Sequence, residues 1–295
     1  MWIYYGIAAG FILGFYDFWT KKAMADNGIF PVVFFSSFFG ALFWVPAFIP
    51  FTYAGMPRIN IDGIHFHEQL IIFVKSTMMT LSWVFAYFSV RELPMSFSGS
   101  VRASGPLWTL AGGSLIFGEF LTPIQLTAVV LSVICYYFLS QIGKKEGINT
   151  LRSLPMTMML IATILSSFTT VYDKFIVQQM GMSVYTVQAY SALHRFIIAT
   201  ALLVLSIKFR QEKYHCKWSL YIPLVGLSWV IAELVYFFAI SDASANVTYL
   251  SIFRRMSLVV GFILSALFIG EKYFLKKLTI ILLIVFSAVL LIFKF

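Results

Sequence analysis

The stretch NVTYLSIFRRMSLVVGFILSALFIGE, Asn246 to Glu271, has the length and the apolar character of a membrane-spanning helix. Arg254 and Arg255 stand side by side in its first half. A cation placed in hydrocarbon costs at least ~2.5 kcal/mol on insertion scales, so such residues are usually functional. The stretch therefore predicts a membrane protein with charged positions in its interior that carry a function.

The rest of the chain has the same character. Of its 295 residues 60% are hydrophobic and 11% are charged, whereas soluble domains carry roughly 25% charged residues. The formal net charge of +9 would suggest a nucleic-acid partner for a soluble protein. Most of the lysines and arginines fall in short loops between apolar runs, so we expect a lipid bilayer and no nucleic acid as the partner.

Hydropathy, together with the glycines and prolines that mark helix ends, divides the chain into ten expected helices. The hydrophilic loops between them are too short to form a soluble domain, and GKKEGINTLRS (143–153) is the natural midpoint. The expected spans are 2–22, 30–50, 69–90, 95–117, 121–141, 155–178, 184–207, 218–240, 247–269 and 273–294.

The two halves resemble each other. FYDFWTKKAM in span 2–22 matches VYDKFIVQQM in span 155–178, so that Asp17 falls on Asp173. VRASGPLWTLAGGSLIFGE matches FRRMSLVVGFILSALFIGE, so that Arg102 falls on Arg254. Because each half has an odd number of spans, the second half must cross the membrane in the opposite sense. The predicted fold is an all-α membrane protein with ten transmembrane helices in two inverted five-helix repeats, residues 1–142 and 154–295.

FGE and IGE at the ends of the fourth and ninth spans, together with YDK in the sixth, resemble the drug/metabolite transporter superfamily, EamA-type branch. This resemblance covers nearly the whole chain. It implies a secondary transporter with a central cavity lined mainly by the first, third, fourth, sixth, eighth and ninth spans. Branches of the superfamily that carry phosphorylated substrates have a basic pair on the ninth helix, and Arg254 with Arg255 is similar in kind and place. The superfamily carries many classes of metabolite, so the resemblance names no substrate.

The charged residues inside the expected helices include five basic ones and three acidic ones, Asp17, Asp173 and Glu233. The excess of cations predicts a small anionic substrate, phosphorylated or carboxylated, which the planar fork of an arginine would bind in a bidentate manner. The protein would then work by alternating access. The expected substrate-binding residues are Arg254, Arg255, Arg102 and Lys75, with Tyr16, Trp83, Tyr87 and Tyr172 in the cavity wall.

The acidic residues have two interpretations each. Asp17 either pairs with Lys21, four residues on, or gates the cavity, and Asp173 either is held by Lys174 or the facing half or gates the opposite side. Glu233 is either the partner of an arginine or a proton-coupling carboxylate, and the first is favoured.

The remaining charged positions also have a structural alternative. Pro106 removes the N–H that would bond to the carbonyl of Arg102, which predicts either a broken helix at a binding site or an ordinary kink with Arg102 reaching the surface. The alternative for Lys75 is that it snorkels to the interface. His194 and Arg195 are expected to be packing residues or part of the gating set.

Other functions are less well supported. An organic cation or zwitterion could bind in an aromatic box with Asp17 and Asp173 as counter-charges, and a non-transporting membrane scaffold is a further alternative. The sequence has no nucleophile elbow, zinc-protease helix or Walker loop, so we expect neither an enzyme nor a pump driven by ATP. His65 and His67 have no further ligand nearby, which argues against a metal site, and no cofactor is expected. The stripe of Gly6, Gly10 and Gly14 predicts close helix packing.

Orientation remains open at this point. We call the side on which the chain begins side X and the other side Y. Of 16 lysines and arginines at loops and ends, 13 fall on side Y and three (Arg58, Lys174, Lys294) on side X, which makes Y cytoplasmic by the positive-inside rule. Family habit places both termini in the cytosol instead. The expected location is a bacterial inner membrane, with a proton or an exchanged metabolite as coupling species and a monomer or homodimer as the working unit.

Overall fold

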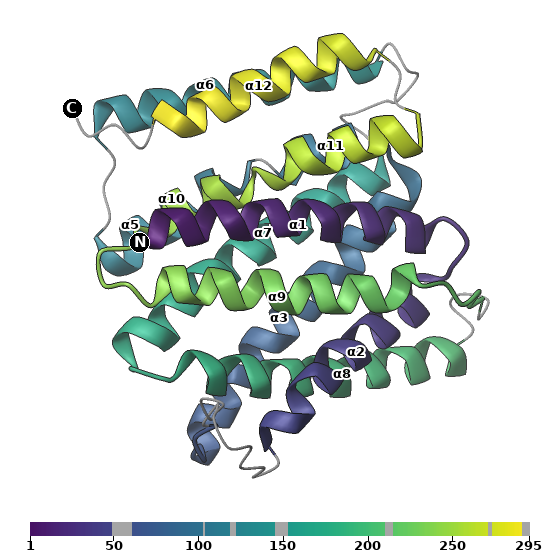
Figure 1. The fold of residues 1–295 in the computed structure, drawn as a ribbon, viewed down its shortest axis with the longest axis vertical. Coiled ribbons are helices and arrows are strands. Elements are labelled where there is room, and N and C mark those ends of the chain that lie inside the picture. Colours follow the sequence, from purple (N-terminus) through teal and green to yellow (C-terminus); the bar gives the residue numbers. More distant parts are fainter. Residues whose placement is uncertain are drawn as a thin grey trace, which may run out of the picture.

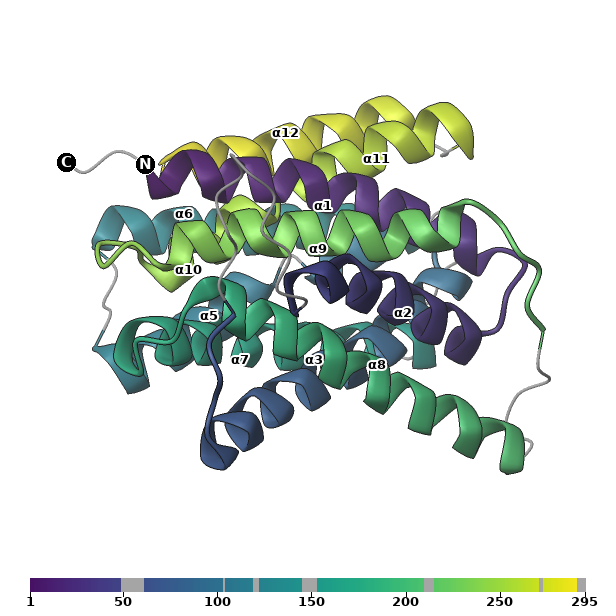
Figure 2. The same cartoon turned by 60° about the horizontal axis from the view of Figure 1, so that its bottom comes forward.

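The secondary structure of the described residues is entirely helical (Figures 1 and 2). The computed structural model describes residues 1–48, 61–102, 104–118, 122–144, 153–209, 215–270 and 273–290. Glu119 and Glu271 of the two family motifs and most of the expected midpoint lie outside these ranges. The elements are α1 (Trp2–Met24), α2 (Ile29–Phe48), α3 (Phe66–Glu92), α4 (Met95–Arg102), α5 (Gly105–Phe117), α6 (Pro123–Lys144), α7 (Leu154–Lys174), the π-helical turn η1 (Phe175–Gln179), α8 (Val184–Lys208), α9 (Tyr221–Ile240), α10 (Val247–Arg254), α11 (Ser257–Phe268) and α12 (Phe274–Leu290).

The expected spans agree with these elements to within a few residues at their ends. Two of them, 95–117 and 247–269, are each divided into two helices, α4 with α5 and α10 with α11. Within the described residues, six segments are long and apolar enough to cross a membrane: Ile29–Phe48, Phe66–Glu92, Leu154–Gln179, Val184–Lys208, Tyr221–Ile240 and Val247–Phe268. The protein is therefore an integral membrane protein, as its composition predicts.

The helices pack so that segments distant in sequence lie side by side. α1 packs along α9 and α3 along α7, while α2 and α8 pack against each other. α6 and α12 form a separate pair at one edge of the bundle (Figure 1). α1 begins and α12 ends at the same end of the bundle, which corresponds to side X (Figure 1).

Both helix breaks have local causes. α4 ends at Arg102 and α5 begins at Gly105 with Pro106 in its first turn, which confirms the predicted opening of the backbone beside Arg102. The break between α10 and α11 has no proline. There the N–H groups of Arg255 and Met256 donate three residues back, at 2.9 and 3.0 Å, so the chain tightens before α11 starts.

The glycine stripe of α1 lies against this second break. A Cβ on Gly10 would overlap the carbonyl oxygen of Phe253, and a Cβ on Gly14 would overlap the side chain of Val260. A Cβ on Gly6 would lie 3.0 Å from Cδ2 of Leu250. The predicted close packing is confirmed, and its partner is the broken helix pair α10 and α11.

Candidate functional site

A cavity of about 60 Å³ lies in the half of the bundle nearer side Y. Its walls come from α1, α3, α4, α7, α9, α10 and α11, which are the six spans expected from the family resemblance. A volume of this size has room for a few water molecules. The charged and aromatic residues that line the cavity are Tyr16, Asp17, Trp83, Tyr87, Arg102, Trp229, Arg254, Arg255 and Phe262.

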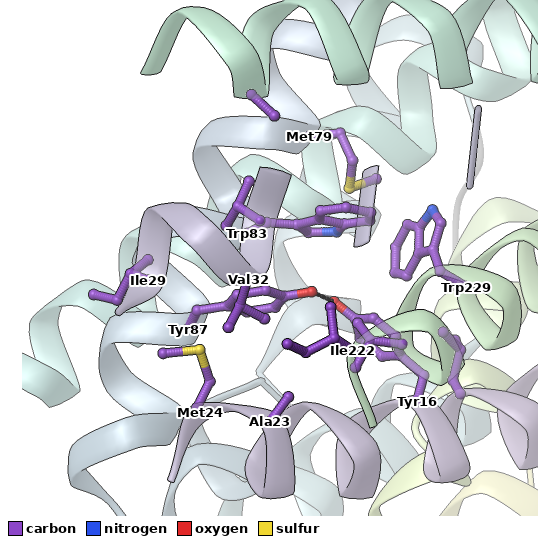
Figure 3. Close-up of a cluster of buried hydrophobic side chains, with 14 of the residues drawn as sticks. Tyr16, Ala23, Met24, Ile29, Val32, Met79, Trp83, Tyr87, Ile222 and Trp229 are labelled. Carbon is purple, nitrogen blue, oxygen red and sulfur yellow. Dashed lines mark hydrogen bonds between the residues drawn. The ribbon is translucent and has the colours of Figure 1, made fainter. Parts of the chain in front are cut away.

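Four aromatic side chains form one wall of the cavity (Figure 3). The hydroxyls of Tyr16 and Tyr87 lie 3.1 Å apart, and the ring of Tyr16 packs on Trp229 with centroids 5.0 Å apart. Trp83 stacks on Tyr87 and meets Trp229 edge to face, with centroids 6.1 and 4.8 Å apart. The indole N–H groups of both tryptophans are buried and have no hydrogen-bond acceptor among the described residues. This wall can therefore contact a flat apolar group and offer two donors.

Arg102 closes the C-terminal end of α4 and forms an ion pair with Asp17 of α1. The interpretation that Asp17 pairs with Lys21 is wrong. Lys21 instead donates to the carbonyls at the end of α3, including that of Leu93 at 2.8 Å, because helix C-termini leave carbonyls without partners. Arg102 is 22% exposed and lines the cavity, and it does not reach the surface of the bundle in the manner of the snorkelling alternative.

Arg254 closes the C-terminal end of α10 and pairs with Glu233 of α9, with 2.7 Å between Nη2 and Oε1. Its guanidinium also lies over the ring of Tyr236, 4.3 Å from the centroid. The favoured interpretation of Glu233 as the partner of an arginine is confirmed. Arg255 points elsewhere: its guanidinium lies against the backbone of Gly105, where any Cβ would collide with it. Arg254 and Arg255 both line the cavity, as Arg102 does. Each of the two helix breaks therefore brings at least one cation to the cavity.

A second polar cluster lies toward side X, beyond the cavity lining. Lys75 of α3 and Asp173 of α7 are almost fully buried and lie 3.1 Å apart, Nζ to Oδ1. Lys75 also lies 3.4 Å from the Ser191 hydroxyl and 4.5 Å from the centroid of Phe237. Lys75 thus does not snorkel. Lys174 does not hold Asp173 either, since it donates to the carbonyl of Ala245 at 3.0 Å.

The other predicted residues lie outside the cavity lining. Arg195 is 2% exposed, with its guanidinium 5.6 Å from the ring of Trp83. His194 is half-buried and packs edge to face against Phe73. Tyr172 stacks on Phe175.

Trp229 of the aromatic wall was absent from the predicted set. The signal that could have found it is a second internal match, LSWV at 81–84 and LSWV at 227–230. This match places Trp229 at the position of Trp83, which was predicted to line the cavity.

Comparison with known proteins agrees with this architecture. Residues 1–141 match the model of the EamA-like transporter family. A solved crystal structure of another protein is similar over 99% of this chain and 98% of its own, with a TM-score of 0.68 and 15% sequence identity, which shows a shared fold. No curated protein matches the chain.

Proposed function

We propose that this protein is a secondary active transporter of a small organic anion, because residues 1–141 match the model of the EamA-like transporter family. It would work by alternating access between two inverted five-helix halves, 1–142 and 154–295, with ten spans in all. The site would take the anion between the broken helices α4–α5 and α10–α11.

The packing pattern supports the inverted repeat. If α1, α2 and α3 correspond to α7, α8 and α9, the contact of α1 with α9 has its counterpart in that of α7 with α3. The contact of α2 with α9 likewise has its counterpart in that of α8 with α3. Corresponding helices also meet each other, as α2 does α8 and α6 does α12. Trp83 and Trp229, which occupy matching places in the two LSWV segments, are in contact with each other, as residues on a two-fold axis should be.

One observation carries the choice of an anion. Arg102, Arg254 and Arg255 reach a single cavity from two broken helices, and among the described lining residues Asp17 is the one carboxylate. The lining therefore has an excess of positive charge, which an anionic ligand would neutralise. α11 also begins at the cavity with Ser257, so the partial positive charge of a half-helix N-terminus points at the same place.

The aromatic wall supports an organic rather than an inorganic anion. Tyr16, Trp83, Tyr87 and Trp229 would pack against the body of the ligand while the arginines bind its carboxylate or phosphate. Lys75 and Tyr172 do not line the cavity in this state, so we propose that they take part only in the state open to side X.

A ligand screen followed by an uptake assay tests the proposal. We expect benzoate or inorganic phosphate to raise the thermal unfolding midpoint of the purified protein, and tetraethylammonium to leave it unchanged. A ligand at 100 times its Kd stabilises by about 2.7 kcal/mol, so binding of ordinary strength is measurable. The stabilising anion is then tested for uptake into proteoliposomes. Arg91→Gln is the matched control, because Arg91 pairs with Glu92 at the end of α3 and does not line the cavity.

The aromatic wall also supports a second candidate, a transporter of an organic cation or zwitterion. Asp17 lines the cavity and could serve as counter-charge, whereas Asp173 does not line it. Stabilisation by tetraethylammonium and not by either anion would favour this candidate. If substitution of the arginines lowers the folded yield and no ligand changes the unfolding midpoint, the scaffold alternative is favoured instead.

The setting of transport is also a proposal. We propose a bacterial inner membrane, and either a proton or an exchanged metabolite as the coupling species. Lys174 is buried in α7 and does not lie in a loop, so it does not count among the loop cations of side X. The excess of loop cations on side Y is therefore larger than the excess counted from the sequence.

A further inference from the structure

Glu233 interacts electrostatically with two arginines and forms an ion pair with one of them. Its Oε1 accepts from Arg254 Nη2 at 2.7 Å, while its Oε2 has no hydrogen-bond partner among the described residues. Glu233 is fully buried, but Arg254 lines the cavity. The carboxylate of Glu233 therefore binds the same guanidinium group that would bind an anion in the cavity.

The second arginine is Arg195 of α8, which packs against α9. Arg195 interacts electrostatically with Glu233 and Asp173. Within the described part of the chain its guanidinium makes no hydrogen bond or ion pair, although it is 2% exposed. Asp173 is already paired with Lys75 at 3.1 Å, although neither of its oxygens makes a hydrogen bond within the described residues, and Glu233 has one oxygen without a hydrogen-bond partner. Of the two carboxylates, Glu233 is the one bound to a cation of the cavity lining, Arg254. A buried cation without a hydrogen-bonded partner is costly unless another state supplies one.

We propose that Glu233 is a tethered competitor of the substrate anion, and that Arg195 is a positioning residue that receives Glu233 when the anion takes Arg254. This proposal rests on the anion site of the proposed function. In the empty state Glu233 neutralises Arg254; in the loaded state the anion does so, and Glu233 moves to Arg195. The exchange couples occupancy of the cavity to a rearrangement between α8, α9 and α10.

The charges of the cluster determine what happens to protons. Lys75, Arg195 and Arg254 carry three positive charges, and Asp173 and Glu233 carry two negative ones. A monovalent anion brings this sum of formal charges to zero. The exchange thus needs no proton, and binding of a monovalent anion should release or take up none.

Four variants of the purified protein test the exchange, with benzoate as the probe and its Kd as the readout. Glu233→Gln removes the competitor, so benzoate should bind about tenfold more tightly. Arg195→Gln removes the receiving group, so Glu233 stays on Arg254 and benzoate should bind about tenfold more weakly. In the Glu233→Gln background, Arg195→Gln should have little further effect, because no carboxylate needs to be received. Arg195→Lys keeps the charge and should bind benzoate nearly as the unmodified protein does.

The outcomes separate this proposal from the function on which it rests. If benzoate fails to bind the unmodified protein, the anion site itself is refuted. If benzoate binds but Glu233→Gln weakens it, Glu233 merely orients Arg254 and the exchange is refuted alone. Equal losses from Arg195→Gln in both backgrounds would refute the positioning role of Arg195. Should Arg195→Gln fail to fold, the direction of the Glu233→Gln effect still decides. Titration calorimetry in two buffers of different ionisation enthalpy should show no proton transfer; uptake of about one proton per benzoate would overturn the exchange in favour of protonation of Glu233.

Discussion

The Lys21 ammonium donates to the backbone carbonyl of Leu93 at 2.8 Å and thereby ties the side Y end of α1 to the turn between α3 and α4. The opposite end of the bundle has the matching arrangement. Lys174 of α7 donates to the carbonyl of Ala245, in the turn between α9 and α10, at 3.0 Å. Gln178 adds bonds to the carbonyls of Ile240 and Asp242 at 2.8 and 2.9 Å. Each half thus fastens the end of its first helix to carbonyls that a helix C-terminus leaves without partners.

Removal of the side Y fastening should destabilise the protein measurably. Lys21→Met keeps the apolar stem but loses the hydrogen bonds to the end of α3. Hydrogen bonds to a charged group contribute about 1.5–3 kcal/mol each, and partial exposure reduces that figure, so we expect a loss of about 1–2 kcal/mol. The measurement is the thermal unfolding midpoint in detergent. Lys22→Met is the control, because within the described residues Lys22 donates one hydrogen bond, to the carbonyl of Phe268 at 3.4 Å, and its loss should change the midpoint less.

The two aspartates should gate opposite sides. Asp17 pairs with Arg102 toward side Y and Asp173 pairs with Lys75 toward side X. Asp17→Asn should therefore favour opening at side Y, and Asp173→Asn opening at side X, since each removes a charge pair that joins two helices.

Single cysteines can report this gating. Ser98 and Thr248 are buried hydroxyl residues on α4 and α10, and each can be replaced by cysteine in a background without Cys135 and Cys216. Asp17→Asn should speed labelling at position 98, and Asp173→Asn should speed it at position 248. If both variants change labelling at position 98 in the same direction, or both do so at position 248, opposed gates are ruled out.

Substitutions of the two arginines of the ninth expected span should have similar effects on affinity and different effects on stability. Arg254→Gln removes a charge-assisted contact of about 1.5–3 kcal/mol, so affinity for the transported anion should fall roughly ten- to hundredfold. Arg255→Gln should have a similar effect on affinity, and it should also loosen the start of α5, because the Arg255 guanidinium lies against Gly105. Uptake into proteoliposomes is measured alongside folded yield. Undiminished uptake in the double variant would refute the anion site.

The glycine stripe should tolerate no side chain at its centre. Gly10→Ala places a methyl group against the carbonyl of Phe253, and overpacking of this kind costs about 1–3 kcal/mol. The thermal unfolding midpoint should fall accordingly. Gly63→Ala is the matched control, since a Cβ there has no neighbour within 4 Å. Equal midpoints for the two variants would show that α1 can move away from α10 without cost.

Most of the residues expected to bind the substrate line the cavity, with two informative exceptions. Tyr16, Trp83, Tyr87, Arg102, Arg254 and Arg255 line it, whereas Lys75 and Tyr172 do not. Lys75 is eight residues before Trp83 on α3, which is about 12 Å along a helix and places it beyond the cavity. Tyr172 follows the lining residue Thr170 by two positions, about 200° around α7, and so points away.

The sequence by itself determined where the helices lie and that the chain belongs in a membrane. These are local properties: runs of apolar residues set the spans, and Pro106 sets the break after Arg102. The tertiary structure alone decided which charges pair. Nearness in sequence offered Lys21 as a partner for Asp17, and it left Lys174 and the facing half open for Asp173. The partners are Arg102, 85 residues from Asp17 in sequence, and Lys75 of the facing half. A buried charge is stabilised by the nearest opposite charge in a medium of low dielectric constant, and packing of distant helices, not sequence spacing, brings that charge close.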